Sequence, residues 1–595
     1  MTEARNSVKD KTRANEAIFD QPARIHGNNT RIGRVVTRFW AEAVLVAVAV
    51  LLWAPRLSGP LSLKWDASTY YVLGTALAEG KGYRLLNEPG EIEAVQYPPL
   101  LPLIVSVHQW AMGTSDYVKV GSALRLTYFV LSMLFLLAVY ALARKLLSRL
   151  CALLVGVMTA LSFLSFLQPS DILYAETPFA LVTMLFLLCH QRNDRPFFAA
   201  ISGLLGAAAY LLRTAGLALL LAWIAESLIR RRFRQAALRA AVSALPVLLW
   251  QVHIWRVIAS DEYNRPAYAY QRADYQYANV TYGKNSGLVD PFQPELGHVQ
   301  FRDLGGRLAR NIVSIPSALG DEAVVPHEFI PYLLGQLQQS LHVRFSSDWR
   351  SQLASASSAC LFSAGLVALA GAVLVATGRQ WFLALYLAIT VAMIVAMPWQ
   401  SQFRRYLVPV TPLTLLFLLL ALLAIRNWLQ RRDSRWACVT SVLAMTVPVA
   451  GILLVQIVLA THMLQSMQPV RYYDASGRER VFKLIAYPGE WQALDSAFEW
   501  IRRHAGPTAV IATSVPHLAY LRTGHKAVLP PFESDADTAG HLLDEVPVGY
   551  VVLDRFGLPG ISERYAALVV AHKLLDWRLA FTAPDGRTRV YERTH

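Results

Sequence analysis

Long apolar stretches separated by short polar segments recur along most of this chain. They lie near residues 39–57, 121–143, 150–168, 176–190, 197–212, 214–229, 240–258, 357–377, 381–398, 406–425 and 436–461. Each can cross the roughly 30 Å of bilayer hydrocarbon as a helix, although the fourth, fifth and sixth are short for it. The pattern predicts a mainly α, polytopic transmembrane protein with about eleven spans.

The distribution of basic residues orients these spans. Each of the following connectors contains Arg or Lys: Arg144–Arg149, Gln191–Arg195, Arg230–Arg239, Gly378–Gln380 and Arg426–Arg435. All of them fall on the cytoplasmic side if the basic tail, residues 1–38, is cytoplasmic, as the positive-inside bias requires. Residues 197–229 decide the number of spans. One long span would send the following basic segment outside, whereas two short spans that meet at Arg213 keep it inside.

The same topology places four segments outside: 58–120, a short loop near 169–175, the long loop 259–356, and everything after about residue 462. The transmembrane domain therefore covers residues 39–461, and residues 462–595 form a smaller extracytoplasmic α/β domain. In that domain Trp491–His504 has helical spacing, Thr508–Thr513 and Val548–Leu553 are short β-rich runs, and Leu579–Glu592 predicts a terminal hairpin.

Composition supports the membrane assignment. The 595 residues are 54% hydrophobic and only 16% charged, with a formal net charge of +15. Cytoplasmic Lys and Arg account for most of that charge, so we expect the lipid bilayer as a partner and no nucleic acid. The four cysteines lie in or beside apolar runs without the spacing of a disulfide framework or a metal site.

Polar side chains gather at the predicted outer ends of the spans. Acids occur there together with arginines and tyrosines: Asp66 with Tyr70, Tyr71 and Tyr97, then Asp171 and Glu176, Arg213, and Arg404 with Arg405, with Arg125 as a weaker candidate. A carboxylate can take a proton from an attacking hydroxyl, and arginines bind phosphate bidentately. This combination suits transfer of a group from a lipid phosphate to an acceptor hydroxyl.

Each of these residues also has a simpler interpretation. Asp66 precedes an amphipathic segment and fits a helix N-cap, Glu176 can be an interfacial acid, and Arg213 can reach the headgroups. Arg404 and Arg405 lie in a short outer loop, where the positive-inside bias disfavours them, so a functional role is favoured there. The tyrosines of 259–356 suit sugar stacking and headgroup contact equally. A disordered spacer is the third, less favoured interpretation of this loop.

The order of these motifs resembles the GT-C superfamily of integral-membrane glycosyltransferases. An outer-loop Asp66 is followed by ALAEGKGYRL and QYPPLLPL, and then by YAETPF, LLRTAGL and FRRYLVPVTP. The arrangement is most similar to the bacterial branch that includes aminoarabinose transferases and protein O-mannosyltransferases, and it covers nearly the whole chain from Arg38 onward. Each motif is loose, so the specificity lies in their order.

The resemblance implies an inverting transferase that moves a sugar from a polyprenyl-phosphate donor at the outer face of the cytoplasmic (inner) membrane. Asp66 would be the general base, Glu176 or Asp171 the second acid, and Arg213, Arg404 and Arg405 would lie near the lipid phosphate. Many relatives carry an Asp-Glu pair in the first loop, whereas Ala67 follows Asp66 here. We therefore expect no cofactor and no metal site, while a divalent metal stays open.

Two other function classes compete with the transferase. A transporter or flippase of a lipid-linked glycan would carry polar residues at mid-membrane depth and discontinuous helices in paired halves, which this sequence lacks. A non-catalytic subunit of cell-envelope assembly would tolerate neutralisation of both Asp66 and Glu176. The acceptor, whether glycolipid, polysaccharide or protein, is left open by the sequence.

Overall fold

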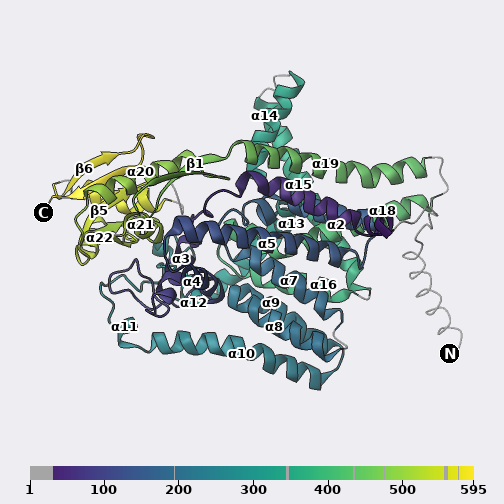
Figure 1. Ribbon diagram of the computed structural model, residues 1–595, viewed down its shortest axis with the longest axis horizontal. Helices are drawn as coiled ribbons and strands as arrows, with labels where there is room; N and C mark the ends of the chain where they lie inside the picture. The colour runs from purple at the N-terminus through teal and green to yellow at the C-terminus, as the bar shows by residue number, and fades with distance from the viewer. Residues whose placement is uncertain are drawn as a thin grey trace. The chain divides into compact units, whose positions relative to one another are not determined.

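The computed structural model describes residues 31–594, apart from 193–194, 343–346, 379, 433–435, 475, 555–559 and 574 (Figure 1). Most of the basic tail predicted for residues 1–38 lies outside the described residues, as do parts of three predicted cytoplasmic connectors. The chain divides into two units, residues 1–44 and 45–595. Helix α2 (Arg31–Trp53) runs across this boundary.

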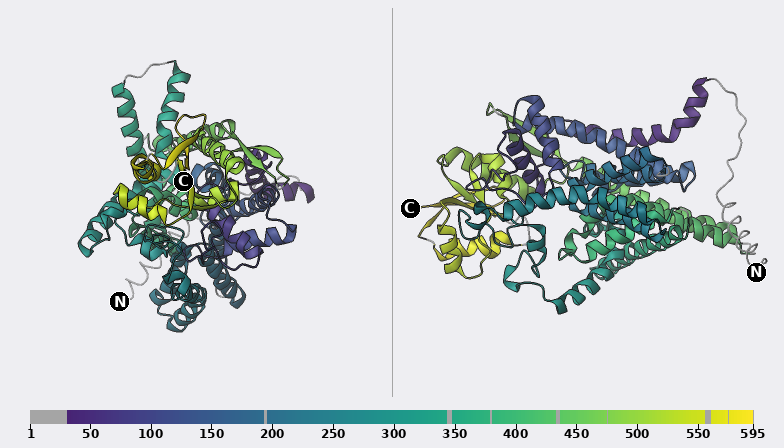
Figure 2. Two further views of the ribbon diagram at one scale, coloured as in Figure 1. Left: turned by 90° about the vertical axis from the view of Figure 1, so that its left-hand side faces the viewer. Right: turned by 90° about the horizontal axis from the view of Figure 1, so that it is seen from below.

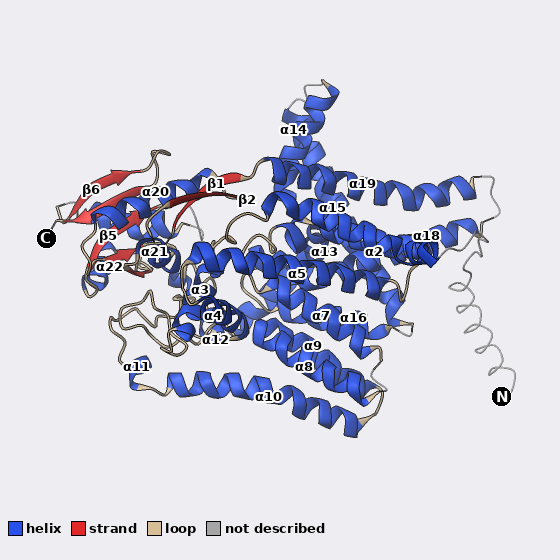
Figure 3. Cartoon of the chain, in the orientation of Figure 1, coloured by secondary structure: helices blue, strands red, loops and turns tan. Residues whose placement is uncertain are grey.

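Helices make up most of the second unit up to residue 465 (Figure 3). They are α3 (Asp66–Ala78), α4 (Leu100–Met112), α5 (Tyr117–Ala143), α6 (Arg149–Leu161), α7 (Glu176–His190), α8 (Pro196–Leu212), α9 (Leu217–Ile229), α10 (Phe233–Ile258), α11 (Asp261–Asn264), α12 (Tyr282–Ser286), α13 (Phe301–Ala323), α14 (Ile330–Leu341), α15 (Ser347–Ala376), α16 (Trp381–Val395), α17 (Phe403–Leu407), α18 (Thr411–Gln430) and α19 (Ala437–Gln465).

Six helical stretches are long and apolar enough to cross a membrane: Phe39–Arg56, Tyr117–Ala143, Phe233–Ile258, Asp348–Ala376, Phe403–Gln430 and Ala437–Gln465. Six further apolar helices of 10–17 residues accompany them. Every predicted span falls on one of these twelve stretches, so the mainly α, polytopic architecture is confirmed. The additional apolar helix is α4, which lies inside the predicted outer loop 58–120.

Residues 197–229 form two helices that pack side by side in opposite directions. A Cβ added to Gly216 would lie 2.5 Å from the carbonyl carbon of Ala209, and one added to Gly206 would lie 2.7 Å from the Leu220 side chain. These close approaches begin at the turn, where the end of α8 meets the start of α9, and continue along both helices away from the turn. The prediction of two short segments that meet at Arg213 is therefore confirmed.

The loop 259–356 differs from the expectation of a spacer, because much of it is helix. Its helix α13 approaches α15 so closely that a Cβ on Gly320 would lie 2.0 Å from the Leu361 carbonyl oxygen, and one on Gly365 1.9 Å from that of Pro316. Mixed charged and apolar positions in α13 conceal this helix from a search for apolar runs. Tertiary packing against α15, rather than its own composition, fixes its place.

The C-terminal part folds as the predicted small α/β domain. Its five-stranded sheet has the order β4-β3-β5-β7-β6, with β3 parallel to β4 and β5, and β7 antiparallel to β5 and β6. The strands are β3 (Val510–Ala512), β4 (Lys526–Val528), β5 (Val548–Leu553), β6 (Trp577–Thr582) and β7 (Arg589–Arg593), and the hairpin β1 (Gln468–Tyr473) and β2 (Glu479–Leu484) precedes them. The helices are α20 (Gly489–His504), α21 (Pro516–Thr523), α22 (Ala536–Asp544) and α23 (Ala567–His572).

This domain lies at the end of the long helices where α3 also lies, in both Figure 1 and Figure 2. The backbone of Ala527 in β4 donates to the Asn87 carbonyl at 2.8 Å, and the Asn87 amide returns a bond of 3.1 Å to Ala527. The first outer loop therefore contacts β4, the strand at one edge of the C-terminal sheet.

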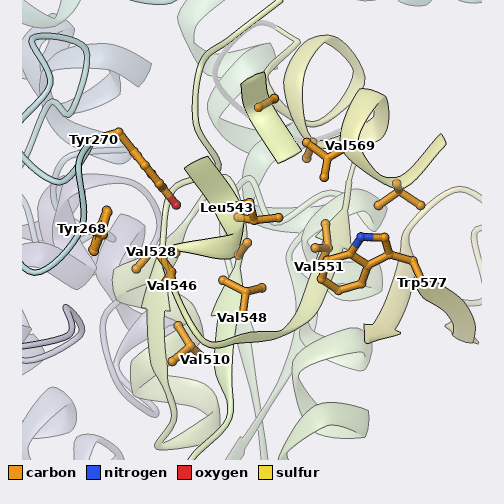
Figure 4. Packing of buried hydrophobic residues seen from close by; sticks show 14 residues of the cluster. Tyr268, Tyr270, Val510, Val528, Leu543, Val546, Val548, Val551, Val569 and Trp577 are labelled. Carbon is orange, nitrogen blue, oxygen red and sulfur yellow. The ribbon is translucent and has the colours of Figure 1, made fainter. Parts of the chain in front are cut away.

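The tyrosine-rich segment also joins this domain. Tyr268 and Tyr270 reach its hydrophobic core and are each 3% exposed (Figure 4). The Tyr268 hydroxyl donates to Glu88 of the first outer loop at 2.6 Å. Tyr275 stacks on Phe532, with ring centroids 4.5 Å apart. These three rings therefore pack between outer segments, while contact of the loop tyrosines with sugar or headgroups stays a prediction.

Candidate active site

Helix α3 begins at Asp66, so this residue is the first of the helix and does not cap it. The capping position belongs to Trp65, whose φ of 57° lies in the left-handed region that bulky residues rarely adopt. The Trp65 ring packs edge-on against Trp491 of α20, with ring centroids 5.5 Å apart. The interpretation of Asp66 as a helix cap is therefore wrong, and its carboxylate makes tertiary contacts instead.

Both carboxylate oxygens of Asp66 have partners from distant segments. The Tyr97 hydroxyl donates to Oδ1 at 3.1 Å, and Nη2 of Arg405 in α17 lies 2.7 Å from Oδ2. The side chains of Asp66 and Arg405 are 22% and 23% exposed, respectively. The carboxylate is thus held in place while part of it stays accessible.

Glu176, the first residue of α7, lies on the other side of Arg405 and is 1% exposed. Its Oε1 accepts a hydrogen bond from Arg405 Nε, and it also lies 2.6 Å from Nη1 of Arg213. Within the described part of the chain, Oε2 of Glu176 is buried and has no hydrogen-bond partner. Arg405 therefore bridges two carboxylates, and Glu176 holds two arginines.

Aromatic rings enclose this four-residue cluster. Arg405 lies over the Tyr174 ring, with its guanidinium carbon 4.3 Å from the ring centroid, and Arg213 lies 5.7 Å from that of Tyr406. The Tyr406 hydroxyl is 3.2 Å from that of Tyr282. Rings on both arginines fix the planes of the guanidinium groups and limit the entry of water.

Two tyrosines of the first outer loop line the Asp66 side. Tyr70 packs edge-on against Tyr97, with ring centroids 5.1 Å apart. Burial, assisted by the negative charge of Asp66, raises the pKa of both hydroxyls above the ordinary value for tyrosine. Tyr97 therefore remains protonated and serves Asp66 as a hydrogen-bond donor.

Asp171 and Arg125 are separate from this cluster and pair with each other. Their side chains are 1% and 0% exposed, and Arg125 Nη1 lies 2.8 Å from Asp171 Oδ1. The remaining Arg125 nitrogens donate to the carbonyls of Gly59 and Pro60 at 3.0 and 2.6 Å. The backbone N–H of Ile485 donates to Asp171 Oδ2 at 2.9 Å. This pair links α5 and the second outer loop to the C-terminal domain.

Arg404 and Tyr71 are likewise not part of the cluster. Arg404 hydrogen-bonds to Glu328 with both terminal nitrogens and lies 3.7 Å from Asp321 Oδ2, which His327 Nδ1 contacts at 2.6 Å. The Tyr71 hydroxyl donates to the carbonyl of Ser115 at 2.8 Å. Of the ten sequence-predicted residues, the structure brings together Asp66, Glu176, Arg213, Arg405, Tyr70 and Tyr97.

One residue of the C-terminal domain that the sequence did not single out lies near the cluster. His517, at the start of α21, is 3% exposed, and its Nε2 has no hydrogen-bond partner among the described residues. Burial lowers the pKa of His517 to about 4, although the charge of Asp66 acts in the opposite direction. Its place in the chain gave no signal, because α21 reaches α3 only through folding.

Tyr174 and Tyr406 were not predicted from the sequence, and Tyr282 was predicted only as one of the tyrosines of 259–356. Tyr174 lies two residues before Glu176 in YAETPF, and Tyr406 directly follows Arg405 in FRRYL. Their position beside those charges was the available signal. Among the described residues, no group of three or more His, Cys, Asp or Glu is placed to hold a metal ion.

Comparison with solved structures identifies the fold. No protein-family model matches the sequence, and no curated protein matches it. Oligosaccharyltransferase of Archaeoglobus fulgidus, tethered to an acceptor peptide, aligns with 94% of this chain and 74% of its own, at a TM-score of 0.50 and 13% identity. ArnT from Cupriavidus metallidurans in the apo state aligns with 93% of this chain and 98% of its own, also at 0.50 and 13%. The chain therefore has the fold of the GT-C membrane glycosyltransferases, as its motifs implied.

Proposed function

We propose that this protein is an inverting glycosyltransferase that transfers a sugar from a polyprenyl-phosphate donor to an acceptor hydroxyl. The observation that carries the proposal is the cluster of Asp66, Arg405, Glu176 and Arg213, in which a partly exposed carboxylate stands beside two arginines. A carboxylate and an anion-binding pair are what this reaction needs, one on each side of the reacting carbon. The fold agrees with this class of enzyme.

In this reaction the acceptor oxygen attacks the anomeric carbon from the face opposite the phosphate. The bond between that carbon and the phosphate oxygen breaks, and its electron pair leaves with the polyprenyl phosphate. The acceptor proton passes to the carboxylate of Asp66, which is 22% exposed and so within reach. Charge that develops on the leaving phosphate is stabilised by Arg213 and Arg405.

Glu176 has a different role from the one that the sequence suggested. It is buried and contacts both arginines through Oε1, so it orients their planes and offsets part of their charge. We assign it as a positioning residue rather than a second base. Asp171 then has no part in the chemistry, because both of its oxygens are bound by Arg125 and the Ile485 backbone.

The proposed location is the cytoplasmic membrane, with the N-terminus inside and the C-terminal domain outside. It rests on the basic connectors and on the position of α3, which begins at Asp66, at the same end of the helices as that domain (Figure 1). The acceptor would then be a glycolipid, polysaccharide or protein of the cell envelope. Labelling of a single cysteine introduced at exposed Ser534 with a membrane-impermeant maleimide, in a background without the native cysteines, tests this orientation.

The function is tested with membranes that contain the protein and a polyprenyl-phosphate sugar. Wild-type membranes should consume the donor, and Asp66→Asn should slow that consumption roughly 100- to 10,000-fold, because the base is lost while the shape is kept. Glu79→Gln, an exposed acid just after the same helix, is the matched control and should behave as wild type. Wild-type turnover by Asp66→Asn would remove Asp66 as the base, and no consumption by the wild-type protein would overturn the function.

A further inference from the structure

The C-terminal domain places a helix directly against the segment that carries Asp66. Tyr520 and Leu521 of α21 pack against a buried apolar group formed by Val72 and Ala76 of α3 together with Leu86. His517 lies one helical turn before Tyr520, at the start of the same helix. Helix α21, which begins at His517's neighbour Pro516, therefore packs on the helix that begins at Asp66, and the charge of Asp66 acts on the imidazole of His517.

His517 is the one polar side chain of α21 that combines near-complete burial with an unsatisfied ring nitrogen, among the described residues. It is 3% exposed, and Nε2 has no hydrogen-bond partner. Arg522, the charged residue of the same helix, forms an ion pair with Asp495 at 2.9 Å, although its Nε is also buried without a hydrogen-bond partner among the described residues. A buried polar atom without a partner costs stability, and a hydrogen bond to a bound ligand would remove that cost.

The chemical environment restricts what that ligand atom can be. An imidazole that stays neutral at physiological pH offers one donor and one acceptor but no charge. The anion-binding groups of the cluster, Arg213 and Arg405, instead gather on Glu176. A neutral hydrogen-bonding group beside the proposed base therefore matches a hydroxyl rather than a phosphate.

We propose that His517 is a substrate-binding residue, whose Nε2 hydrogen-bonds a hydroxyl group of a substrate bound beside Asp66. This inference rests on the proposed transferase function and adds to it a contribution from the C-terminal domain. The hydroxyl belongs either to the sugar of the donor or to the acceptor, since both reach Asp66 during transfer. In either case the docking of α21 on α3 completes the site.

The substitution His517→Phe tests the contact with little change in volume. It removes an unpartnered buried nitrogen, so the purified protein should melt at the same or a higher temperature than wild type. Catalytic efficiency should nevertheless fall roughly 3- to 10-fold, the value of one neutral hydrogen bond. His517→Gln, which can present an amide near the same point, should recover most of that loss. His541→Phe, an exposed histidine of the same domain, is the matched control.

Three measurements identify the hydroxyl. They are the affinity for undecaprenyl phosphate, the affinity for an undecaprenyl-phosphate hexose, and the concentration of a total membrane-glycolipid extract that half-saturates transfer. If His517→Phe weakens only binding of the hexose-carrying lipid, the hydroxyl belongs to the donor sugar. If it raises only the half-saturating amount of extract, the hydroxyl belongs to the acceptor.

Three results would overturn the assignment. If His517→Phe matches wild type in all three measurements, His517 does not bind substrate. If His517→Phe lowers the melting temperature, and His517→Gln restores the melting temperature but not the transfer rate, His517 is structural. Loss confined to undecaprenyl phosphate itself would place Nε2 on the phosphate and contradict the hydroxyl assignment. If the wild-type protein binds neither lipid and transfers nothing, the proposed transferase function fails first, which separates that failure from a failure of His517.

Discussion

Two acid–arginine groups at the same end of the helices differ in how completely their polar atoms are satisfied. The pair of Asp171 and Arg125 is closed, since each side-chain nitrogen and oxygen has a hydrogen-bond partner and neither side chain is more than 1% exposed. The group around Arg405 is open, because Asp66 is 22% exposed and an oxygen of Glu176 has no partner in the described chain.

The comparison separates a structural ion pair from a site that can still bind something. A closed, buried pair resists change, because removal of one partner leaves an uncompensated charge in the interior. An open group contains polar atoms that have no partner within the protein and can bind a substrate, and these unpartnered atoms cost some stability. Both groups are built from acids and arginines near the predicted outer ends of spans, so exposure and the remaining hydrogen-bonding capacity are what distinguish them.

The largest effect on stability is expected at the closed pair. Asp171→Asn leaves the Arg125 guanidinium buried without its counter-charge, at a cost of about 3–5 kcal/mol. The purified protein should therefore lose its folded form at a much lower temperature in a thermal melt. The double substitution of Arg125→Met and Asp171→Leu should recover part of the loss. An Asp171→Asn protein that melts like wild type but transfers no sugar would make Asp171 the second functional acid.

Glu176→Gln should have the next largest effect, this time on transfer. Both arginines lose the anion that orients them, and misplacement of such groups by about 1 Å costs roughly 100-fold in rate. Single-turnover rates at saturating donor measure this loss. A raised KM with an unchanged rate would instead mean that Glu176 contributes only to donor binding.

Neighbouring arginines offer a sharper version of the comparison. Arg405→Lys should reduce transfer about tenfold or more, because one ammonium group cannot replace a planar fork that bridges two carboxylates. Arg404→Lys keeps a cation near Glu328 and Asp321, outside the open group, and should stay within about twofold of wild type. Initial rates of donor consumption compare the two, and equal losses would contradict the separation of the residues.

The smallest expected effect concerns acidity. The pKa of His517 is lowered to about 4 by burial, whereas an exposed histidine titrates near 6.5. Between these values the unfolded chain binds more protons, so the contribution of neutral His517 is complete above about pH 6.5 and is lost progressively as the pH falls toward 4. Melting temperatures from pH 7 to 4 should fall more steeply for wild type than for His517→Phe. Parallel curves would show that His517 does not titrate in this range.

Much of the helical architecture was predictable because bilayer-spanning helices need about 20 apolar residues, a requirement that is visible in any window of sequence. The turn at Arg213 followed from the placement of the basic segment after it. Helix α13 was not predictable, since its polar positions conceal the apolar pattern and its place depends on the contact of Gly320 with the backbone of α15. The pairing of Asp171 with Arg125 was hidden for the same reason, because the Ile485 N–H that completes it comes from more than 300 residues away.

The sequence by itself determined that this is a multi-pass membrane protein, that acids and arginines accumulate at one end of its helices, and that a small α/β domain follows. Local periodicity and the positive-inside bias are sufficient for that. Tertiary structure alone decided which acid meets which arginine and which of them stay accessible. It also decided that α21, which carries His517, packs against α3, which begins at Asp66. Such contacts join segments far apart in the chain, and burial or exposure of a charge exists only once those segments have packed.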